Sequence, residues 1–403
     1  MASLDALEAS DPSSVAQQIA AAQSAATVEH DVAQPDPPAT PTVTAPSVQV
    51  GDFGVLEVDG LMADFQTDPD RDSALGDDDN ESFTTSINST VTDYKFEHGR
   101  RYHAYQDGKY ALPNDDAEIN RLELQHRIWQ LSLSGRLNLA PISPTVRNVL
   151  DIGCGTGAWV IEFAEAHPDC RVTGADLSPI QPTLVPPNVE FIVDDITSPW
   201  IYMQRFDYIH SRAITVGIAD WSGLVEQCWK NLEPGGWVEF QEYHMPVTAD
   251  DGTMANGPAF QLWNDSLKAA TTKVGIHLDA ILNVPPTLKQ RGFVNLGTAG
   301  TKWPIGPWPK GKREKKIGEL TEKVSFRSRA GACYGLTPTA CLQDLSSAIE
   351  GSSLRLFTKV LGWSMEEVQK LVKEVERDIA ARRMHSYIPI DFLWAQKPYD
   401  AVD

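Results

Sequence analysis

Residues 148–176 constrain the fold of this chain more than any other stretch, and they read NVLDIGCGTGAWVIEFAEAHPDCRVTGAD. The apolar run at 149–152 predicts a buried strand, and the glycines after it predict a tight turn. Apolar residues at helical spacing over 158–166 predict a helix, and residues 171–175 predict a second strand that ends on Asp176. A strand, a glycine turn, a helix and a strand that ends on an acid predict a ligand-binding α/β unit.

The three glycines of the turn, Gly153, Gly155 and Gly157, let the backbone bend and let a ligand approach it closely. Asp176 follows Gly157 by roughly the 20 residues that place an acid on ribose hydroxyls. The pattern Gly-x-Gly-x-x-Ala also fits the dinucleotide sites of nicotinamide and flavin enzymes. Asp151 favours another ligand, because a carboxylate beside the turn would repel a pyrophosphate and attract a cation such as S-adenosylmethionine.

Length and composition exclude several classes of protein. The 403 residues and 42% hydrophobic content suffice for a large core. No apolar run approaches the roughly 20 residues of a membrane span, and the N-terminus carries no recognisable secretory signal. The five cysteines include no CxxC pair. We therefore expect reduced thiols, no metal site, no membrane association and an intracellular protein, in the cytoplasm or the nucleus.

Most of the formal net charge of −21 lies near the N-terminus, because residues 1–80 contain sixteen Asp or Glu and a single Arg. Residues 1–85 are also rich in Pro, Thr and Ala, which predicts a disordered acidic tail. We favour a solvated tail over the alternative, a segment that binds a protein partner. The acidic chain predicts no direct binding to nucleic acid, because the phosphates would be repelled.

Strands and helices alternate beyond Asp176. The further strands that we expect are 188–193, 206–209, 237–240, 293–296 and 387–395, and the helices between them include 222–231 and 258–274. With the first two strands, these give an α/β fold with a doubly wound, Rossmann-like sheet of seven strands. Ligands bind at the carboxyl ends of the strands in such a sheet, where Asp195, His210–Arg212 and Glu242–His244 are expected.

We divide residues 86–400 into three parts. An N-terminal helical cap covers 86–145 and contains a helix over 117–137, capped by Asn114 or Asp115. The sheet core covers 146–302 and 386–400. A helical insertion at 303–385 contains a helix over 365–384 that starts with a capping box, and we expect it to wall an acceptor pocket. The basic run at 310–316 is either an exposed loop or a nuclear-import signal.

These residues resemble the class I S-adenosylmethionine-dependent methyltransferases, whose first motif is an acid followed by x-Gly-x-Gly-x-Gly, as at 151–157. The turn Leu-x-Pro-Gly-Gly at 232–236 belongs to the same resemblance. It implies S-adenosylmethionine as cofactor and Asp176 as the residue that binds ribose. It also implies that Asp195 and Ile196 bind adenine, with Asp194 as the alternative acid.

A narrower resemblance is to the fungal LaeA-like methyltransferases. It is carried by four segments, GRRYHAY at 99–105, YALPNDDAE at 110–118, RLELQH at 121–126 and YIP at 387–389. Members of this family act in nuclear complexes that govern secondary metabolism or methylate small molecules. We favour a small-molecule acceptor in fungal secondary metabolism over a nuclear regulator that acts in a protein complex.

The sequence does not single out a catalytic base. An oxygen or nitrogen acceptor needs one in some cases, and His103, His210 and His244 are candidates. His210 is also counted among the residues expected to bind the cofactor. For each histidine taken alone, a structural or surface role is the stronger expectation.

Overall fold

The structure is a computed structural model that describes residues 94–97, 99–102, 112–325 and 348–401. The predicted acidic tail and the candidate base His103 lie outside these ranges. Within them, no helix is both long and apolar enough to span a lipid bilayer. Nor do these residues form a group of three or more His, Cys, Asp or Glu that could hold a metal ion. Cys154, Cys170 and Cys228 are free thiols.

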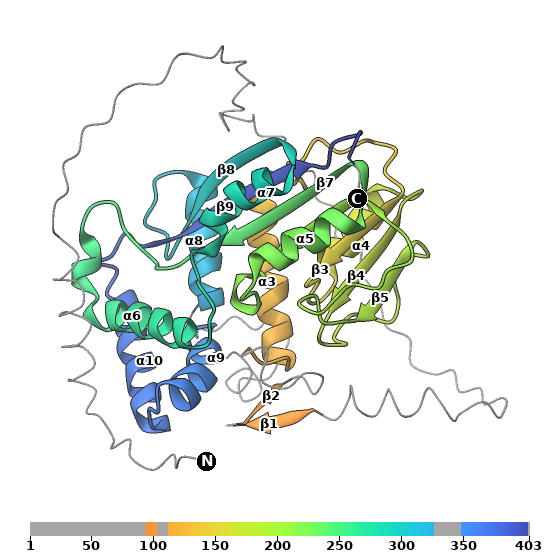
Figure 1. Cartoon of the computed structure of the whole chain (residues 1–403). Coiled ribbons are helices and arrows are strands. Elements are labelled where there is room, and N and C mark those ends of the chain that lie inside the picture. Colours follow the sequence, from red (N-terminus) through yellow and green to blue (C-terminus); the bar gives the residue numbers. More distant parts are fainter. Residues whose placement is uncertain (1–93, 98, 103–111, 326–347, 402–403) are drawn as a thin grey trace, which may run out of the picture. The chain divides into compact units, whose positions relative to one another are not determined.

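Seven strands form one sheet in the order β5-β4-β3-β6-β7-β9-β8 (Figure 1). Their bounds are β3 Asn148–Ile152, β4 Arg171–Asp176, β5 Val189–Val193, β6 Phe206–Arg212, β7 Leu232–Tyr243, β8 Val294–Pro304 and β9 Tyr387–Gln396. Strands β3 to β7 pair in parallel, whereas β9 runs antiparallel to both β7 and β8. The strand order reverses between β3 and β6, which is where such sheets bind ligands. The predicted doubly wound, seven-stranded sheet is confirmed.

Helices cover both faces of the sheet. Helix α4 (Ala158–Ala166) packs against Val149 on one face. Helices α5 (Trp221–Asn231) and α7 (Val284–Arg291) pack against Leu150 on the other. These two residues are neighbours in β3, and successive strand residues point to opposite faces. A buried strand with apolar residues on both sides therefore fixes a three-layer core.

The described residues before β3 form one helix and a small ribbon. Strands β1 (Lys95–Glu97) and β2 (Arg100–Tyr102) pair antiparallel and precede α3 (Asp116–Ser132). Asp115 caps the helix, as one of the two predicted caps. The helix ends before the predicted limit at residue 137, because Ser134, which follows the C-cap residue Leu133, adopts the left-handed conformation with a φ of 54°. That conformation is a common helix terminator.

The insertion contributes α8 (Lys312–Ser325), α9 (Ala348–Arg355), the single π-turn η4 (Leu356–Val360) and α10 (Met365–Ala380). The predicted capping box at α10 is present, since the backbone N–H of Ser364 donates to Glu367 Oε2 at 2.7 Å and that of Glu367 donates to Ser364 Oγ at 3.2 Å. Helix α6 (Pro258–Lys273) lies between β7 and β8 in the chain, yet it packs with α9, η4 and α10 (Figure 1). Two separate segments therefore build this helical layer.

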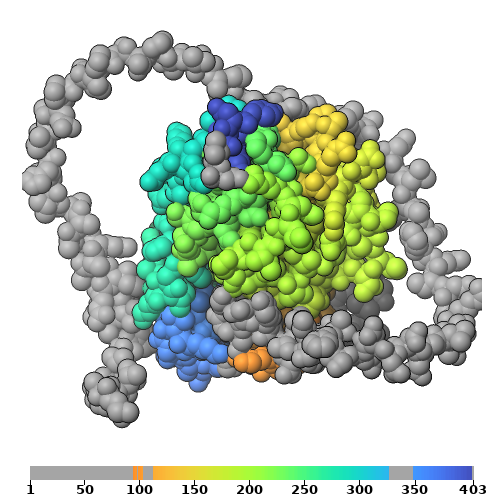
Figure 2. Space-filling model, turned by 45° about the vertical axis from the view of Figure 1, so that its right-hand side comes forward, coloured from red at the N-terminus to blue at the C-terminus, as the bar shows by residue number. Residues whose placement is uncertain are grey.

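The ribbon β1–β2 is fastened to the same layer. Arg355 Nε and Lys359 Nζ donate to the carboxylate of Glu97 at 3.1 and 2.8 Å. The Arg355 guanidinium also lies over the ring of Tyr102, 3.7 Å from its centroid. Figures 1 and 2 accordingly show the orange ribbon beside the blue helices of the insertion. The start of the described chain thus meets the helices that precede the last strand.

Candidate active site

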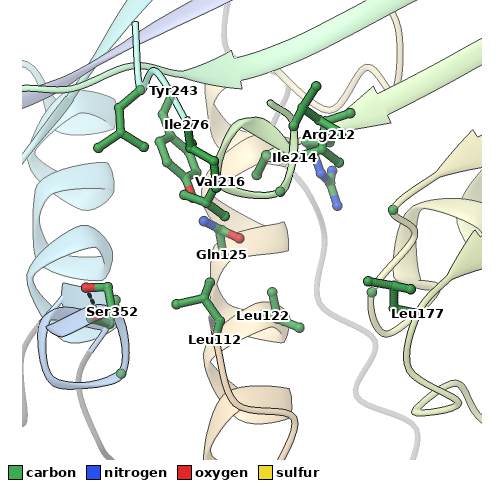
Figure 3. A pocket seen from close by; sticks show the side chains of 18 of the residues that line it. Leu112, Leu122, Gln125, Leu177, Arg212, Ile214, Val216, Tyr243, Ile276 and Ser352 are labelled. Carbon is green, nitrogen blue, oxygen red and sulfur yellow. Dashed lines mark hydrogen bonds between the residues drawn. The ribbon is translucent and has the colours of Figure 1, made fainter. Parts of the chain in front are cut away.

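One cavity of about 1010 Å³ runs along the carboxyl ends of the parallel strands and between the helices above them (Figure 3). Asp151 in β3, Asp176 at the end of β4 and Asp195 beyond β5 all line it, as does Ile196. The volume lies at the upper limit of the about 300–1,000 Å³ that is usual for small-molecule pockets. A cavity of this size has room for a cofactor and a second small molecule.

The glycine turn forms part of the cavity wall. Gly153, Gly155 and Gly157 have φ angles of 72°, 56° and 78°, a region that side chains with a Cβ rarely adopt. A Cβ on Gly153 would lie 2.5 Å from Ile214, and one on Gly157 would overlap the ring of Phe191. Gly157 does not line the cavity, so its glycine is required by packing behind the turn.

His210 lies beneath Asp151 and does not line the cavity. Its Nδ1 is 2.7 Å from Asp151 Oδ1, its ring stacks on Trp159 at 3.8 Å, and it is fully buried. The expectation that His210 sits beyond its strand was wrong, because β6 continues to Arg212 and pairs His210 with Asp151. His210 therefore holds the Asp151 carboxylate from behind.

Asp176 fastens the glycine turn to the end of β4. Its Oδ2 accepts from the backbone N–H of Gly155 at 2.8 Å, and its Oδ1 accepts from that of Ser178 at 2.9 Å. Burial raises the pKa of this carboxyl above its usual value, although the two hydrogen bonds act in the opposite direction. The acid and the turn thus form one unit at the cavity wall.

The acids after β5 divide into two kinds. The Asp195 carboxylate accepts from the Thr197 N–H at 2.9 Å, the Thr197 hydroxyl at 2.6 Å and the Ser198 hydroxyl at 2.9 Å. It therefore closes its own turn while lining the cavity. Asp194 lines the cavity as well, and among the described residues its Oδ2 has a single long contact, at 3.4 Å, with the hydroxyl of Tyr202.

His244 lies away from the cavity, with its Nδ1 2.6 Å from Asp391 Oδ2. The strand β7 continues to Tyr243, and that residue, not His244, lines the cavity. Of the three candidate bases, the two that the structure describes, His210 and His244, are therefore not placed to touch a substrate.

Sequence reasoning missed the face that α3 turns to the cavity. It named no residue of this helix as part of a site, but the cavity is lined from α3 by Glu118, Arg121, Leu122, Gln125 and His126. These positions recur at three- and four-residue spacing, as one helical face does. The side of α3 that faces the cavity therefore carries polar residues. Their three- and four-residue spacing was the sequence signal that could have predicted this polar face.

Arg212 brings a positive charge to the acidic end of the cavity. It lines the cavity at the end of β6, and its Nη2 is 2.8 Å from His126 Nδ1. Burial lowers the pKa of Arg212 to about 10 and also lowers that of His126. A neutral His126 accepts this hydrogen bond on Nδ1, so that nitrogen is not free to act as a base.

A buried acid supports the loop after β6. Glu242 accepts from the backbone N–H groups of Ile214 and Thr215 at 3.0 and 3.1 Å, and from the Thr215 hydroxyl at 2.8 Å. Burial raises the pKa of Glu242 to about 7. Ile214 in turn lines the cavity and fills the space beside Gly153. Glu242 does not line the cavity itself, but it holds the loop that places Ile214 in the cavity wall.

The far end of the cavity is mostly apolar. Its wall comes from the segment after β7, from α6 and the loop after it, from the residue after β8, and from α9, η4 and β9. It includes Met245, Val247, Phe260, Trp263, Leu267, Leu278, Ile305, Ile349, Leu356 and Ile388. We call these residues the apolar chamber. Most of them belong to the hydrophobic cluster shared by α6 and the insertion.

Comparisons with known proteins identify the family. A family described as "Methyltransferase domain" matches residues 124–275. Methyltransferase pytC of Aspergillus terreus is 36% identical over 322 residues, which cover 80% of this chain and 93% of pytC. Protein-methionine methyltransferase laeA of Emericella nidulans is 31% identical over 317 residues, which cover 78% of this chain and 79% of laeA. The chain therefore belongs to the class I S-adenosylmethionine-dependent methyltransferases, in the fungal LaeA-like family.

Proposed function

We propose that this enzyme methylates a small molecule of secondary metabolism. The observation that carries the proposal is a single cavity in which the acids at the strand ends adjoin an apolar chamber. An in-line methyl transfer needs donor and acceptor held together, and one continuous cavity provides room for both side by side.

The acidic end fits the donor. S-adenosylmethionine supplies a methyl group on a cationic sulfonium and also carries an ammonium group. Asp151 is 3% exposed and offers negative charge to such a cation. We assign the ribose to Asp176. For the adenine amine we favour Asp194, because the Asp195 carboxylate already accepts three hydrogen bonds from its own turn. Ile196 offers its backbone N–H and an apolar surface.

Calorimetry with S-adenosylhomocysteine tests the donor site in wild type and in Gly155→Asp. The new carboxylate would enter the cavity beside Asp151 and Asp176, so we expect a loss of binding. Gly135→Asp is the matched control, since Gly135 is exposed, has a similar φ of 78° and has open space around it. Equal binding by wild type and Gly155→Asp would refute the assignment.

A regulatory role is the alternative, because laeA of Emericella nidulans is named a protein-methionine methyltransferase and laeA of Aspergillus flavus a secondary metabolism regulator. The basic run at 310–316 also lies at the exposed N-terminal end of α8, where a nuclear-import signal would be accessible. The apolar chamber favours a small acceptor.

Metabolite profiles of a deletion strain separate these roles. Strains complemented with wild type and with Gly155→Asp should be compared with the parent. We expect one missing methylated compound that only wild type restores. Changes across many unrelated pathways would favour the regulator instead.

A further inference from the structure

The polar face of α3 lies directly beside the glycine turn. A Cβ on Gly155 would meet Leu122 Cδ1 at 3.6 Å, so the middle of α3 covers the turn. Glu118, Arg121 and Gln125 lie one turn or less from Leu122 on the same helical face, and all line the cavity. Polar groups are therefore present where the donor end passes into the apolar chamber.

The charges on this face cancel. Arg121 donates from Nε and Nη2 to the carboxylate of Glu118 at 2.7–3.0 Å, and both side chains are nearly buried. A bidentate pair of this kind leaves no net charge for a ligand. An anionic acceptor would have to compete with Glu118 for Arg121, and it would also meet Asp151 and Asp176 nearby.

Uncharged hydrogen-bonding groups complete the polar face. Gln125 is 8% exposed, and among the described residues its amide has no hydrogen-bond partner. Burial raises the pKa of Tyr243 to about 12, so its hydroxyl keeps its proton. Thr321 on α8 lines the cavity at 1% exposure, and its hydroxyl has no partner within the described ranges. Figure 3 shows Gln125 and Tyr243 among the lining side chains. Buried groups of this kind need a partner.

We infer that the acceptor is a neutral, largely apolar molecule with a hydroxyl or similar uncharged polar group. Its body occupies the apolar chamber, and its polar group bonds to Gln125 on the polar face of α3, with the hydroxyls of Tyr243 and Thr321 as further polar groups of the same cavity wall. This inference rests on the proposed methyl transfer and specifies the class of substrate. It makes Gln125 a specificity-determining residue.

Nile red, a neutral apolar dye, is a suitable probe of the chamber. Its binding is followed by fluorescence with the full chain saturated with S-adenosylhomocysteine. Ser352 lines the cavity on α9, one turn from the chamber residue Ile349, so Ser352→Phe should narrow the chamber whereas Ser352→Ala should leave it open. We expect Ser352→Phe to weaken Nile red binding about tenfold or more and Ser352→Ala to leave it within about twofold. Equal binding by the Phe and Ala variants would overturn the inference.

Competition tests the polar group. At pH 7, 2-naphthol, naphthalene and 2-naphthoate should displace Nile red in that order, with about fivefold between the first two, as one hydrogen bond gives. In Gln125→Leu that advantage of naphthol over naphthalene should be lost. Gln130→Leu is the control, because Gln130 lies on α3, bonds to Glu162 and is absent from the cavity wall.

The two proposals fail separately. Loss of S-adenosylhomocysteine binding in wild type would refute the donor site. Strongest displacement by 2-naphthoate, or an advantage of naphthol that survives in Gln125→Leu, would refute only the neutral acceptor. No displacement by any of the three compounds would also count against it.

Discussion

The two ends of the cavity are built in different ways. At the donor end, charged groups are held by short hydrogen bonds. Asp176 holds Gly155 within the strand–turn–helix unit, and His210 holds Asp151 from the neighbouring strand β6. At the acceptor end, the wall is mostly apolar and comes from segments far apart in the chain, including α6, α9 and β9. Hydrogen bonds fix direction, whereas apolar packing tolerates changes of shape.

This difference separates a constant task from a variable one. The donor is the same molecule for every member of the family, so its end gains from fixed charges. An acceptor end made of separate helices can change without disturbing the sheet. Changes at one end should therefore leave binding at the other end intact, and each of the following experiments tests that independence.

Asp151→Ala should have the largest effect. The charge pair at stake is the one proposed between the Asp151 carboxylate and the ammonium group of the ligand. Truncating one partner of such a buried pair costs about 2–5 kcal/mol, so calorimetry should show S-adenosylhomocysteine affinity reduced about thirtyfold or more. Nile red binding without cofactor should stay within about twofold. Asp169→Ala removes an exposed acid outside the cavity and serves as the control. A parallel loss of dye binding would break the comparison.

Glu242→Gln should change how stability depends on pH. The pKa of Glu242 is raised from its ordinary 4.5 to about 7 in the folded state, so its proton stabilises the fold below pH 4.5 and this contribution is lost as pH rises through 7. Glutamine has no such proton. Wild-type stability minus that of the variant should therefore fall by about 3 kcal/mol at most over this window, measured by urea unfolding. A difference that is flat with pH contradicts the assignment.

His210→Phe keeps the stacking on Trp159 and removes the bond to Asp151. We expect S-adenosylhomocysteine affinity to fall about tenfold, because a hydrogen bond to a charged group contributes about 1.5–3 kcal/mol and this one acts indirectly. His244→Phe is a close control, since His244 has a similar bond to Asp391 away from the cavity. Equal affinities of both variants would show that His210 does not position Asp151.

Ser364→Ala should have the smallest effect. It removes the N-cap of α10 and should lower the free energy of unfolding by about 1 kcal/mol. Lys370→Ala on the same helix is exposed and should cost less than about 0.5 kcal/mol. Cofactor affinity should be unchanged in both, because α10 belongs to the helical layer of the chamber. A weaker cofactor would mean that the two ends are coupled.

Local patterns predicted the donor end well but misplaced particular residues. The strand–turn–helix unit at 148–166 lies where its apolar spacing indicated. His210 and His244 were misjudged because β6 and β7 extend further than their apolar runs. Polar residues can continue these strands because residues on neighbouring strands supply their hydrogen-bond partners. The hydrophobic pattern of one strand does not show which partners its neighbours will supply.

The sequence by itself determined the order of strands and helices, the glycine turn and the capping box of α10, because each depends on backbone preferences within a few residues. The tertiary structure alone decided that His210 supports Asp151, that the polar face of α3 covers the glycine turn, and that α6 joins the insertion to form the chamber. Those arrangements depend on contacts between distant segments, which form only when the sheet and its helices pack together.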